Sequence, residues 1–263
     1  MHLYGLLGYP LTHSFSQRYF TEKFRGMGIT ENYSYQNFAI PSIEQFPQLL
    51  ADYPFLKGFN VTIPYKKQII PFLDEMNEAV KEMGACNCVH IKNGKLLGFN
   101  TDIIGFEQSL QPFLKPSHSH ALILGTGGAA SAVAYVLRKL QIPYLFVSRN
   151  AGDQTIQYNQ VDSELLKKYT LIINTSPVGQ FPDIAASPEI PYESLGPNHH
   201  LFDLIYNPET TRFMELGLQQ GATVQNGYEM LVLQAEESHA NWFKRRYLSS
   251  IFRQSLGCIS MDY

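Results

Sequence analysis

The sequence contains few cysteines, and their arrangement argues against both a disulfide framework and a metal centre. Its 263 residues include three cysteines, Cys86, Cys88 and Cys258. Because an odd number of cysteines cannot all pair, a reduced, cytoplasmic protein is the simplest expectation. Cys86 and Cys88 are too close together for a typical zinc-binding pair, and the histidines at 118 and 120 have no further ligand nearby in the sequence. We therefore expect no metal site.

Long hydrophobic runs and an excess of one charge are also absent. No apolar stretch approaches the length of a membrane span, and the N-terminal residues lack the basic region of a signal peptide. The formal net charge is −3, which gives no reason to expect nucleic acid or a membrane as a partner. The G-x-S-x-G, H-E-x-x-H and Walker motifs are missing as well. These absences leave a globular protein that acts on a small molecule as the expected class.

The strongest motif that is present lies in the middle of the chain, A-L-I-L-G-T-G-G-A-A at 121–130. Residues 121–124 are typical of a buried strand, the form G-x-G-x-x-A follows, and apolar residues then recur at helical spacing. Strand, glycine turn and helix are the context of a dinucleotide site, in which the helix N-terminus offers N–H groups to a pyrophosphate. The alternative is an ordinary tight turn. Because the motif begins at Gly125, the residues before it are expected to bind substrate.

The next predicted strand, residues 144–147, bears on the choice of nucleotide. It ends in Ser148-Arg149-Asn150, where an NAD site usually has an acidic residue that bonds the ribose 2′-hydroxyl. The guanidinium of Arg149 suits a 2′-phosphate instead, so the sequence favours NADP over NAD. An ordinary surface arginine is the alternative, and the nearby Asp153 opposes the inference because its charge would repel a phosphate.

Hydrophobic periodicity predicts an α/β protein in which strands and helices alternate. The first hundred or so residues mix parallel crossovers with an antiparallel pair, because Asn93-Gly94 is a strong hairpin signal. Predicted strands cover residues 3–7, 33–38, 55–62, 86–92, 95–99, 121–124, 144–147, 171–174, 200–205 and 223–225. Besides the helix after the glycine turn, predicted helices cover residues 16–27, 43–50, 65–73, 103–114, 211–220 and 229–247.

Four polar clusters lie where strands are predicted to end, at residues 11–16, 60–66, 84–87 and 100–102. In open α/β sheets, ligands gather at the carboxyl ends of strands. The hydroxyls and amides of these clusters suit a polyhydroxylated ligand, and Lys66 together with Asp102 suits proton transfer. Taken singly, Ser14 or Ser16 also fits a helix cap, Asn60 a turn, and Lys66 a solvated position.

These motifs resemble those of the shikimate dehydrogenase family along the whole chain. They are G-Y-P-L-T-H-S-F-S at 8–16, N-V-T-I-P-Y-K at 60–66, G-A-C-N at 84–87, N-T-D at 100–102, G-T-G-G-A-A at 125–130, N-T-S-P-V-G at 174–179, D-L-I-Y at 203–206 and N-G-Y-E-M-L-V-L-Q-A at 226–235. Two departures are visible. The family often has Asn-Arg-Thr, followed by a second basic residue, where this chain has Ser148-Arg149-Asn150 and Asp153. Cys88 stands where a threonine is common.

The resemblance implies an α/β fold with an N-terminal mixed-sheet substrate domain at 1–102, a Rossmann NADP-binding domain at 103–228, and C-terminal helices at 229–263 that return to the first domain. It implies a monomer or homodimer that reversibly reduces 3-dehydroshikimate to shikimate with NADPH, in aromatic amino-acid biosynthesis. Lys66 and Asp102 would be catalytic. The substrate would be held by Ser14, Ser16, Asn60, Thr62, Asn87, Tyr206 and Gln234. The cofactor would be held by Gly125, Thr126, Gly127, Gly128, Ala129, Ser148, Arg149, Leu204 and Gly227.

Three other functions stay open at this point. A quinate/shikimate dehydrogenase that uses NAD would have the same site residues. A non-catalytic sensor of shikimate or nucleotide is disfavoured because both Lys66 and Asp102 are present and no regulatory domain is appended. A folate-linked dehydrogenase of similar architecture is disfavoured by the serine-rich first loop.

Overall fold

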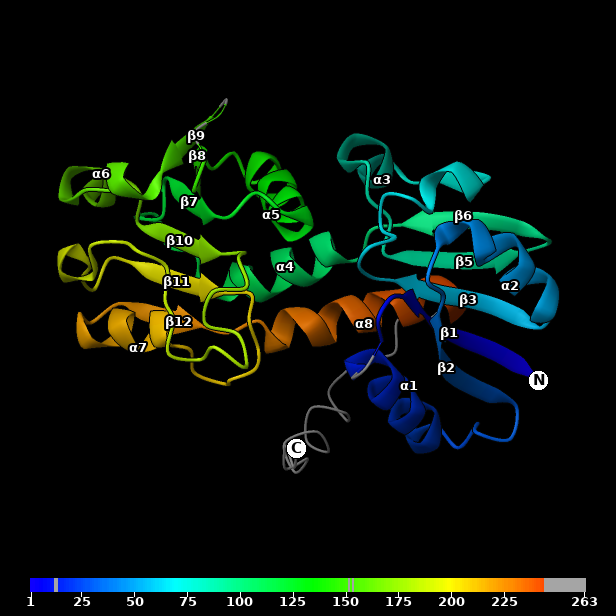
Figure 1. Ribbon diagram of the computed structural model, residues 1–263. Coiled ribbons are helices and arrows are strands. Elements are labelled where there is room, and N and C mark those ends of the chain that lie inside the picture. The colour runs from blue at the N-terminus through cyan, green and yellow to red at the C-terminus, as the bar shows by residue number, and fades with distance from the viewer. Residues whose placement is uncertain (12–13, 151, 153, 244–263) are drawn as a thin grey trace. The chain divides into compact units, whose positions relative to one another are not determined.

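The chain folds into two compact units, each built around its own β-sheet (Figure 1). The computed structural model describes residues 1–11, 14–150, 152 and 154–243. The first unit contains Met1–Thr101 together with residues 235–243, and the second contains Asp102–Gln234. The sequence places domain boundaries after residues 102 and 228, whereas the structure divides the chain after Thr101 and again within the last helix.

The first unit contains a six-stranded mixed sheet with the strand order β2-β1-β3-β5-β6-β4. β1, β2 and β3 run parallel, β5 is antiparallel to both β3 and β6, and β4 is parallel to β6. Asn93 and Gly94 join β5 to β6, and both have the positive φ that a tight hairpin turn requires. The strands are β1 (His2–Gly8), β2 (Tyr33–Ala39), β3 (Leu56–Val61), β4 (Glu75–Met76), β5 (Cys88–Lys92) and β6 (Lys95–Phe99).

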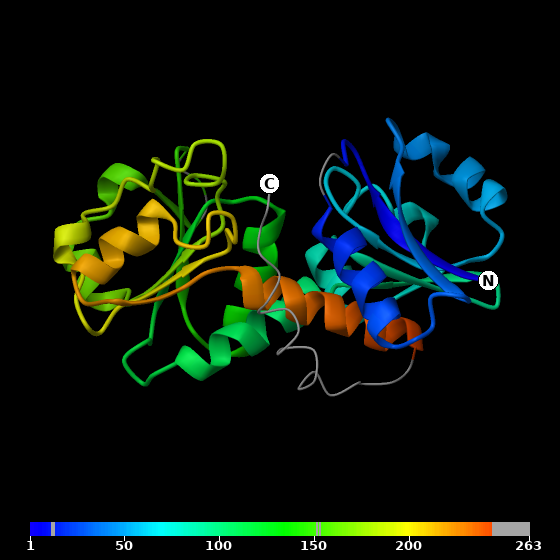
Figure 2. The ribbon, with the colours of Figure 1, turned by 90° about the horizontal axis from the view of Figure 1, so that it is seen from below.

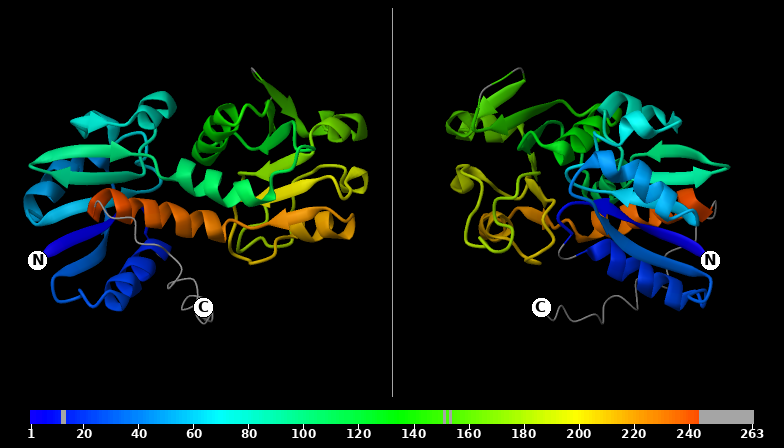
Figure 3. Two further views of the ribbon diagram at one scale, coloured as in Figure 1. Left: turned by 180° about the vertical axis from the view of Figure 1, so that it is seen from behind. Right: turned by 45° about the vertical axis from the view of Figure 1, so that its right-hand side comes forward.

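The two faces of this sheet are covered differently, because successive residues of a strand point to opposite sides. Phe59 and Val61 of β3 pack into a core with η1 (Ile43–Gln45), α2 (Phe46–Asp52) and α3 (Glu78–Met83). On the other face, Phe20 of α1 (Phe15–Gly26), Tyr4 of β1 and Tyr35 of β2 pack around Trp242 of α8 (Tyr228–Phe243). Figures 2 and 3 show α1 beside this end of α8. Gly58 of β3 admits the indole, since a Cβ there would lie 2.6 Å from it.

The second unit contains an entirely parallel sheet with the order β12-β11-β10-β7-β8-β9. From β7 the chain proceeds to β8 and β9 on one side, and later to β10, β11 and β12 on the other. The strand order therefore reverses at β7, which is where open α/β sheets bind ligands. The strands are β7 (Ala121–Leu124), β8 (Tyr144–Ser148), β9 (Thr155–Gln157), β10 (Leu171–Asn174), β11 (His200–Asp203) and β12 (Thr223–Gln225).

Helices cover both faces of the parallel sheet. Leu122 and Leu124 of β7 point into a core with residues of α6 (Ser163–Lys168) and α7 (Arg212–Gln219). Phe106 of α4 (Asp102–Leu110) stacks on Phe202 of β11, with 5.3 Å between ring centroids, and α4 packs against α5 (Gly128–Lys139). The short 3₁₀ helices are η2 (Ile70–Phe72), η3 (Gln111–Phe113), η4 (Tyr158–Gln160) and η5 (Tyr192–Ser194).

One predicted helix is wrong. Residues 65–73 form turns followed by η2, because Pro71 cannot donate a helical hydrogen bond and the carbonyl of Lys66 accepts from Cys86 N instead. The strand predicted at 200–205 ends at Asp203, whose side chain accepts from Ile205 N and turns the chain. Within the described ranges, no helix is both long and apolar enough to cross a membrane.

Candidate active site

The carboxyl ends of β1, β3 and β6 lie at one edge of the first unit's sheet. Leu7 of β1 pairs with Val61 of β3, and Cys88, the first residue of β5, lies between Asn60 and Phe99. The clusters at 11–16, 60–66 and 100–101 follow β1, β3 and β6, and the cluster at 84–87 precedes β5. The sheet therefore gathers at one edge the residues of this unit that are predicted to bind substrate. Residues 12 and 13 lie outside the described ranges.

The two predicted serines lie at the start of α1. Ser14 is its N-cap, and its Oγ accepts a hydrogen bond from Gln17 N at 3.1 Å. This bond uses a lone pair of the oxygen and leaves the hydroxyl proton to donate, so a cap serine can also bind a carboxylate. Ser16 hydrogen-bonds the phenol of Tyr35; burial raises the pKa of that phenol, and the bond to Ser16 opposes the rise.

Asn60, at the end of β3, uses both ends of its buried side-chain amide within the protein. Its Oδ1 accepts from the Tyr35 hydroxyl at 3.0 Å, and its Nδ2 donates to Asn87 O at 3.3 Å and to Ser238 Oγ at 2.8 Å. Since both N–H groups are engaged, the bonding supports a role for Asn60 in holding neighbouring segments together. Its direct contact with substrate stays a prediction.

Asn87 is tied to the residue that follows β6. Thr101 N donates to Asn87 Oδ1 at 2.7 Å, and Asn87 Nδ2 donates to Thr101 Oγ1 at 3.1 Å. Both residues are buried. Because a backbone N–H can only donate, the Thr101 bond fixes which side of the Asn87 amide carries the oxygen. The predicted substrate residue thus has one defined orientation.

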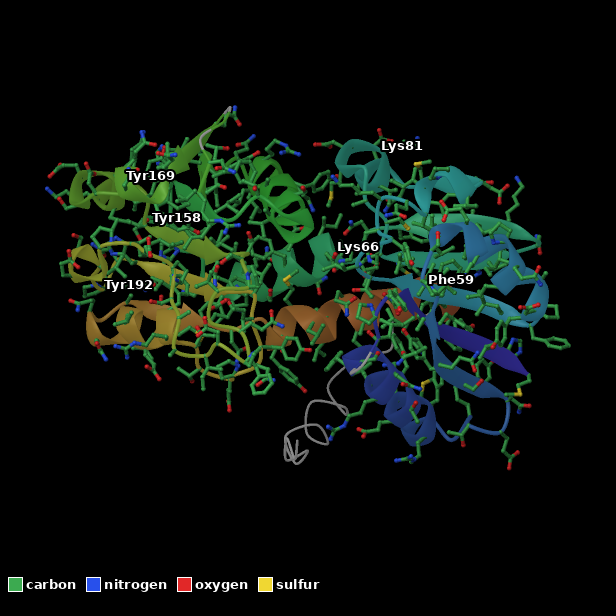
Figure 4. The ribbon with its side chains drawn as sticks, viewed as in Figure 1. Phe59, Lys66, Lys81, Tyr158, Tyr169 and Tyr192 are labelled. Carbon is green, nitrogen blue, oxygen red and sulfur yellow. The ribbon has the colours of Figure 1, made fainter. Side chains whose placement is uncertain are left out.

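Lys66 and Thr62 belong to the loop that follows β3. The loop is held by its backbone, since Tyr65 N donates to Thr62 O at 2.9 Å and Cys86 N donates to Lys66 O at 2.8 Å. Tyr65 anchors it further by donating its hydroxyl to Ile40 O at 2.5 Å. Figure 4 shows Lys66 on this loop, beyond the strand that carries Phe59. The loop is thus fixed while the side chain of Lys66 stays half-buried.

The glycine turn of the second unit has the geometry of a phosphate cradle. Gly125 has φ +108°, and a Cβ there would lie 3.0 Å from Thr175 Oγ1, so the turn requires glycine. Gly127 is the N-cap of α5 and makes no side-chain cap bond, and a Cβ at Gly127 or Gly128 would meet nothing within 4 Å. Ala130 is buried against the sheet. The N-terminus of α5 therefore has no capping side chain, and the space beside Gly127 and Gly128 is open.

Ser148 ends β8 and Arg149 follows it next to this turn, since Gly125 N donates to Val147 O at 2.8 Å. Arg149 is exposed, and its carbonyl accepts from Gln157 Nε2 at 3.3 Å. Burial raises the pKa of Tyr158, and the nearby guanidinium of Arg149 opposes the rise. Figure 4 labels Tyr158 on this side of the second unit. Asp153 lies outside the described residues.

Gly227 and Leu204 approach each other closely. Gly227 N donates to Ile205 O at 2.9 Å, and a Cβ on Gly227 would lie 2.0 Å from Leu204 O, so only glycine fits there. Leu204 N in turn donates to Asn174 O. Tyr206, two residues after Leu204, is half-buried. The backbone thus fixes the segment in which two cofactor residues and one substrate residue are predicted.

Asp102 and Gln234, the remaining predicted residues, belong to α4 and α8. Asp102 is the first residue of α4, and Gln234 is buried and donates its Nε2 to Leu231 O at 2.9 Å. Both belong to the second unit, whereas Lys66 belongs to the first. The pairing of Lys66 with Asp102 stays a prediction. Among the described residues, no group of three or more His, Cys, Asp or Glu side chains is placed to hold a metal ion.

Comparison with known proteins decides the family. A shikimate dehydrogenase (NADP(+)) of Caldicellulosiruptor saccharolyticus is 35% identical over 265 residues, which span 94% of this chain and 94% of the relative. The chain belongs to the shikimate dehydrogenase family. The model of the shikimate dehydrogenase substrate binding domain matches residues 6–89, which include the serine loop and the Lys66 loop.

Solved structures of the family have the same fold over nearly the whole chain. Shikimate 5-dehydrogenase from Thermus thermophilus, in complex with NADP(H) and shikimate, is 30% identical with a TM-score of 0.81, covering 93% of this chain and 94% of that one. The ligand-free 5-ketofructose reductase of a Gluconobacter species is 26% identical with a TM-score of 0.82, covering 97% and 98%. The predicted α/β architecture, with a mixed-sheet domain and a Rossmann domain, is confirmed.

Sequence reasoning missed two residues of the shikimate dehydrogenase site region. Thr101 lies in the N-T-D motif, in which the sequence predicts a role for Asp102 alone. Ser238 lies one helical turn after Gln234 on α8, and this i, i+4 spacing was the available signal. Its contacts with β3 and with Thr101 depend on tertiary packing, which a local pattern does not contain.

Proposed function

We propose that this shikimate dehydrogenase family member catalyses the reversible NADPH-dependent reduction of 3-dehydroshikimate to shikimate. The observation that carries the proposal is the similarity to NADP(+)-dependent shikimate dehydrogenases over nearly the full length of the chain. The two units supply matching features, a polar strand edge with one lysine in the first and a nucleotide turn in the second. Function in the cytoplasm, as a monomer or homodimer, belongs to the same proposal.

The residues of the second unit fit NADP. The open N-terminus of α5 suits a pyrophosphate, because Gly127 and Gly128 leave space there and no side chain caps the helix. Arg149 follows β8, where the adenosine ribose is read, and its charge suits a 2′-phosphate. Leu204 and Gly227 would border the nicotinamide. When bound, NADPH supplies the hydride.

Lys66 would donate and accept the proton that the reaction transfers. As the ketone of the substrate is reduced, negative charge develops on its oxygen, and the ammonium of Lys66 stabilises this charge and donates a proton to it. In the oxidative direction, the neutral amine accepts that proton. Asp102 would orient Lys66 and accept a hydrogen bond from a substrate hydroxyl. Ser14 and Ser16 would donate hydrogen bonds to the substrate carboxylate.

Absorbance at the nicotinamide band, followed with purified protein, tests the proposal directly. Shikimate and quinate are each offered with NADP+ and with NAD+, and 5-ketofructose is offered with NADPH and NADH. We expect the highest kcat/KM for shikimate with NADP+. Preference for NAD+ or quinate would indicate the quinate/shikimate dehydrogenase alternative. Nucleotide binding by calorimetry without turnover of any substrate would indicate a sensor.

A further inference from the structure

Ser238 of α8 connects two other segments of the first unit. It is fully buried, its Oγ accepts from Asn60 Nδ2 at 2.8 Å, and it lies 3.2 Å from Thr101 Oγ1. Its hydroxyl also hydrogen-bonds the buried Cys88 thiol. Asn60 belongs to β3 and Thr101 follows β6, so one hydroxyl joins the helix to two of the strand ends that carry predicted substrate residues. A buried network of this kind specifies one arrangement only when every member is present.

Ser238 and Asn87 both lie within hydrogen-bond distance of the Thr101 hydroxyl. Since Asn87 Nδ2 donates to Thr101 Oγ1, the proton on that oxygen is directed elsewhere. Ser238 Oγ lies 3.2 Å away and Asn87 Oδ1 lies 3.3 Å away. Asn87 Oδ1 already accepts from Thr101 N at 2.7 Å. Either hydroxyl can donate in the contact between Thr101 and Ser238. When Thr101 donates, Ser238 takes the proton that would otherwise reach the Asn87 amide oxygen, which is predicted to meet the substrate.

We propose that Ser238 is a positioning residue for shikimate binding, which orders the hydrogen bonds of Asn60 and Thr101 and through Thr101 sets the bonding state of the Asn87 amide. The inference rests on the proposed function. Without Ser238, Thr101 loses a hydroxyl partner beside Asn87 Oδ1, and one donor of Asn60 loses its acceptor. Both changes act on the substrate side, and neither involves the glycine turn that is predicted to bind NADP.

Steady-state kinetics of Ser238→Ala test this role. We expect the shikimate KM to rise about fivefold, the factor that corresponds to about 1 kcal/mol for one neutral hydrogen bond, while kcat stays within about twofold and the KM for NADP+ does not change. The matched control is Ser109→Ala, which removes an equally buried serine hydroxyl that donates to Phe106 O in the second unit. It should leave the shikimate KM unchanged.

A double-mutant cycle separates positioning from general loss of packing. Thr101→Val keeps the shape of the side chain but removes its hydroxyl, and we expect the same rise in shikimate KM. If Ser238 acts through Thr101, the double variant Ser238→Ala with Thr101→Val shows much less than the product of the two effects. Independent, multiplicative effects would overturn the proposal, as would parallel increases in the KM for shikimate and NADP+. A parent protein that does not oxidise shikimate refutes the proposed function and this inference with it.

Discussion

The two units prepare their binding edges by different means. At the edge of the mixed sheet, buried side chains such as Asn60, Asn87 and Ser238 hold one another in fixed orientations. At the edge of the parallel sheet, the backbone itself forms the binding geometry, since Gly125 and Gly127 shape the turn and the N-terminus of α5 has no capping side chain. The first arrangement suits a small ligand read by its hydroxyls, and the second suits a phosphate read by amides.

The difference predicts which substitutions each unit tolerates. In the first unit, truncation of a polar side chain leaves a buried partner unsatisfied, so small deletions are expected to have large effects. In the second, the N–H groups of the turn survive any side-chain truncation, and the damaging change is the addition of a Cβ at Gly125 or Gly227.

Removal of the Lys66 side chain, in the first unit, is expected to have the largest effect on activity. Lys66→Ala should lower kcat by roughly 10²–10⁴, the usual contribution of an acid/base group, with little change in NADP+ binding. Lys67→Ala is the matched control, because this neighbouring lysine is exposed. Initial rates of shikimate oxidation decide the matter, and a kcat within threefold of the parent would exclude Lys66 from proton transfer.

Ion pairs of similar length in the two units should differ in their contribution to stability. Lys23 Nζ lies 2.6 Å from Glu236 Oε1, with side-chain exposures of 4% and 14%, and Tyr19 also donates to Glu236. Lys23→Ala leaves this carboxylate buried without its cation, so the free energy of unfolding should fall by about 3–5 kcal/mol.

The second unit provides the control for that variant. Lys139 Nζ lies 2.7 Å from Glu107 Oε2, but 55% of the lysine side chain is exposed. Lys139→Ala should therefore change the free energy of unfolding by less than about 1 kcal/mol in urea denaturation. Equal effects of the two variants would show that burial does not distinguish these pairs.

Acid should destabilise the second unit through His200. Burial and, to a smaller extent, the charges of His118 and Lys115 lower the pKa of this histidine to about 4, although the nearby side chain of Gln225 opposes them. Because the folded pKa lies below the usual 6.5, this contribution to stability is complete above pH 6.5 and is lost as the pH falls toward 4. The loss amounts to roughly 3 kcal/mol for a shift of this size.

Unfolding free energies at pH 7.5 and pH 5 measure this effect in the parent and in His200→Asn. The variant should lose the part of the pH dependence that His200 contributes, whereas substitution of the exposed His2 should preserve all of it. In the first unit, burial and Lys23 lower the pKa of His239 to about 4 as well, but Glu236 opposes the shift. An unaltered pH dependence in His200→Asn would assign the acid sensitivity to the first unit.

The sequence predicted the second unit more accurately than the first. The strands at 121–124 and 171–174 have the predicted bounds, because fully buried parallel strands are short apolar runs between turn residues. The strand at 223–225 also has its predicted bounds, although it is only partly buried. In the first unit, the segment at 65–73 looks helical by its apolar spacing but is held by tertiary bonds from Cys86 and Tyr65. Local periodicity does not contain such bonds.

The same limit applies to the site residues. The motifs predicted which loops meet at each edge, since parallel strands bring their carboxyl ends together. They did not predict that Lys23, on the apolar stripe of α1, is buried against Glu236. Nor did they predict that the side-chain amide of Asn60 is hydrogen-bonded to Tyr35 and Ser238. Such pairs join residues that are distant in the chain, and their register depends on how α8 packs on the sheet.

Arg149→Ala has a smaller expected effect than the substitutions of Lys66, Lys23 and His200, and it tests whether the backbone-based site also depends on one side chain. The pyrophosphate contacts at the glycine turn are common to NADP and NAD, so only the 2′-phosphate should sense the loss of the guanidinium. The ratio of kcat/KM for NADP+ over NAD+ should therefore fall about tenfold, which corresponds to about 1.4 kcal/mol. Arg138→Ala, an exposed arginine in the last turn of α5 that bonds the Tyr144 hydroxyl at 2.9 Å, should leave the ratio unchanged. A parent enzyme that already prefers NAD+, or a ratio unaffected by Arg149→Ala, would exclude Arg149 from cofactor selection. Nucleotide binding would then be assigned to the backbone of the glycine turn.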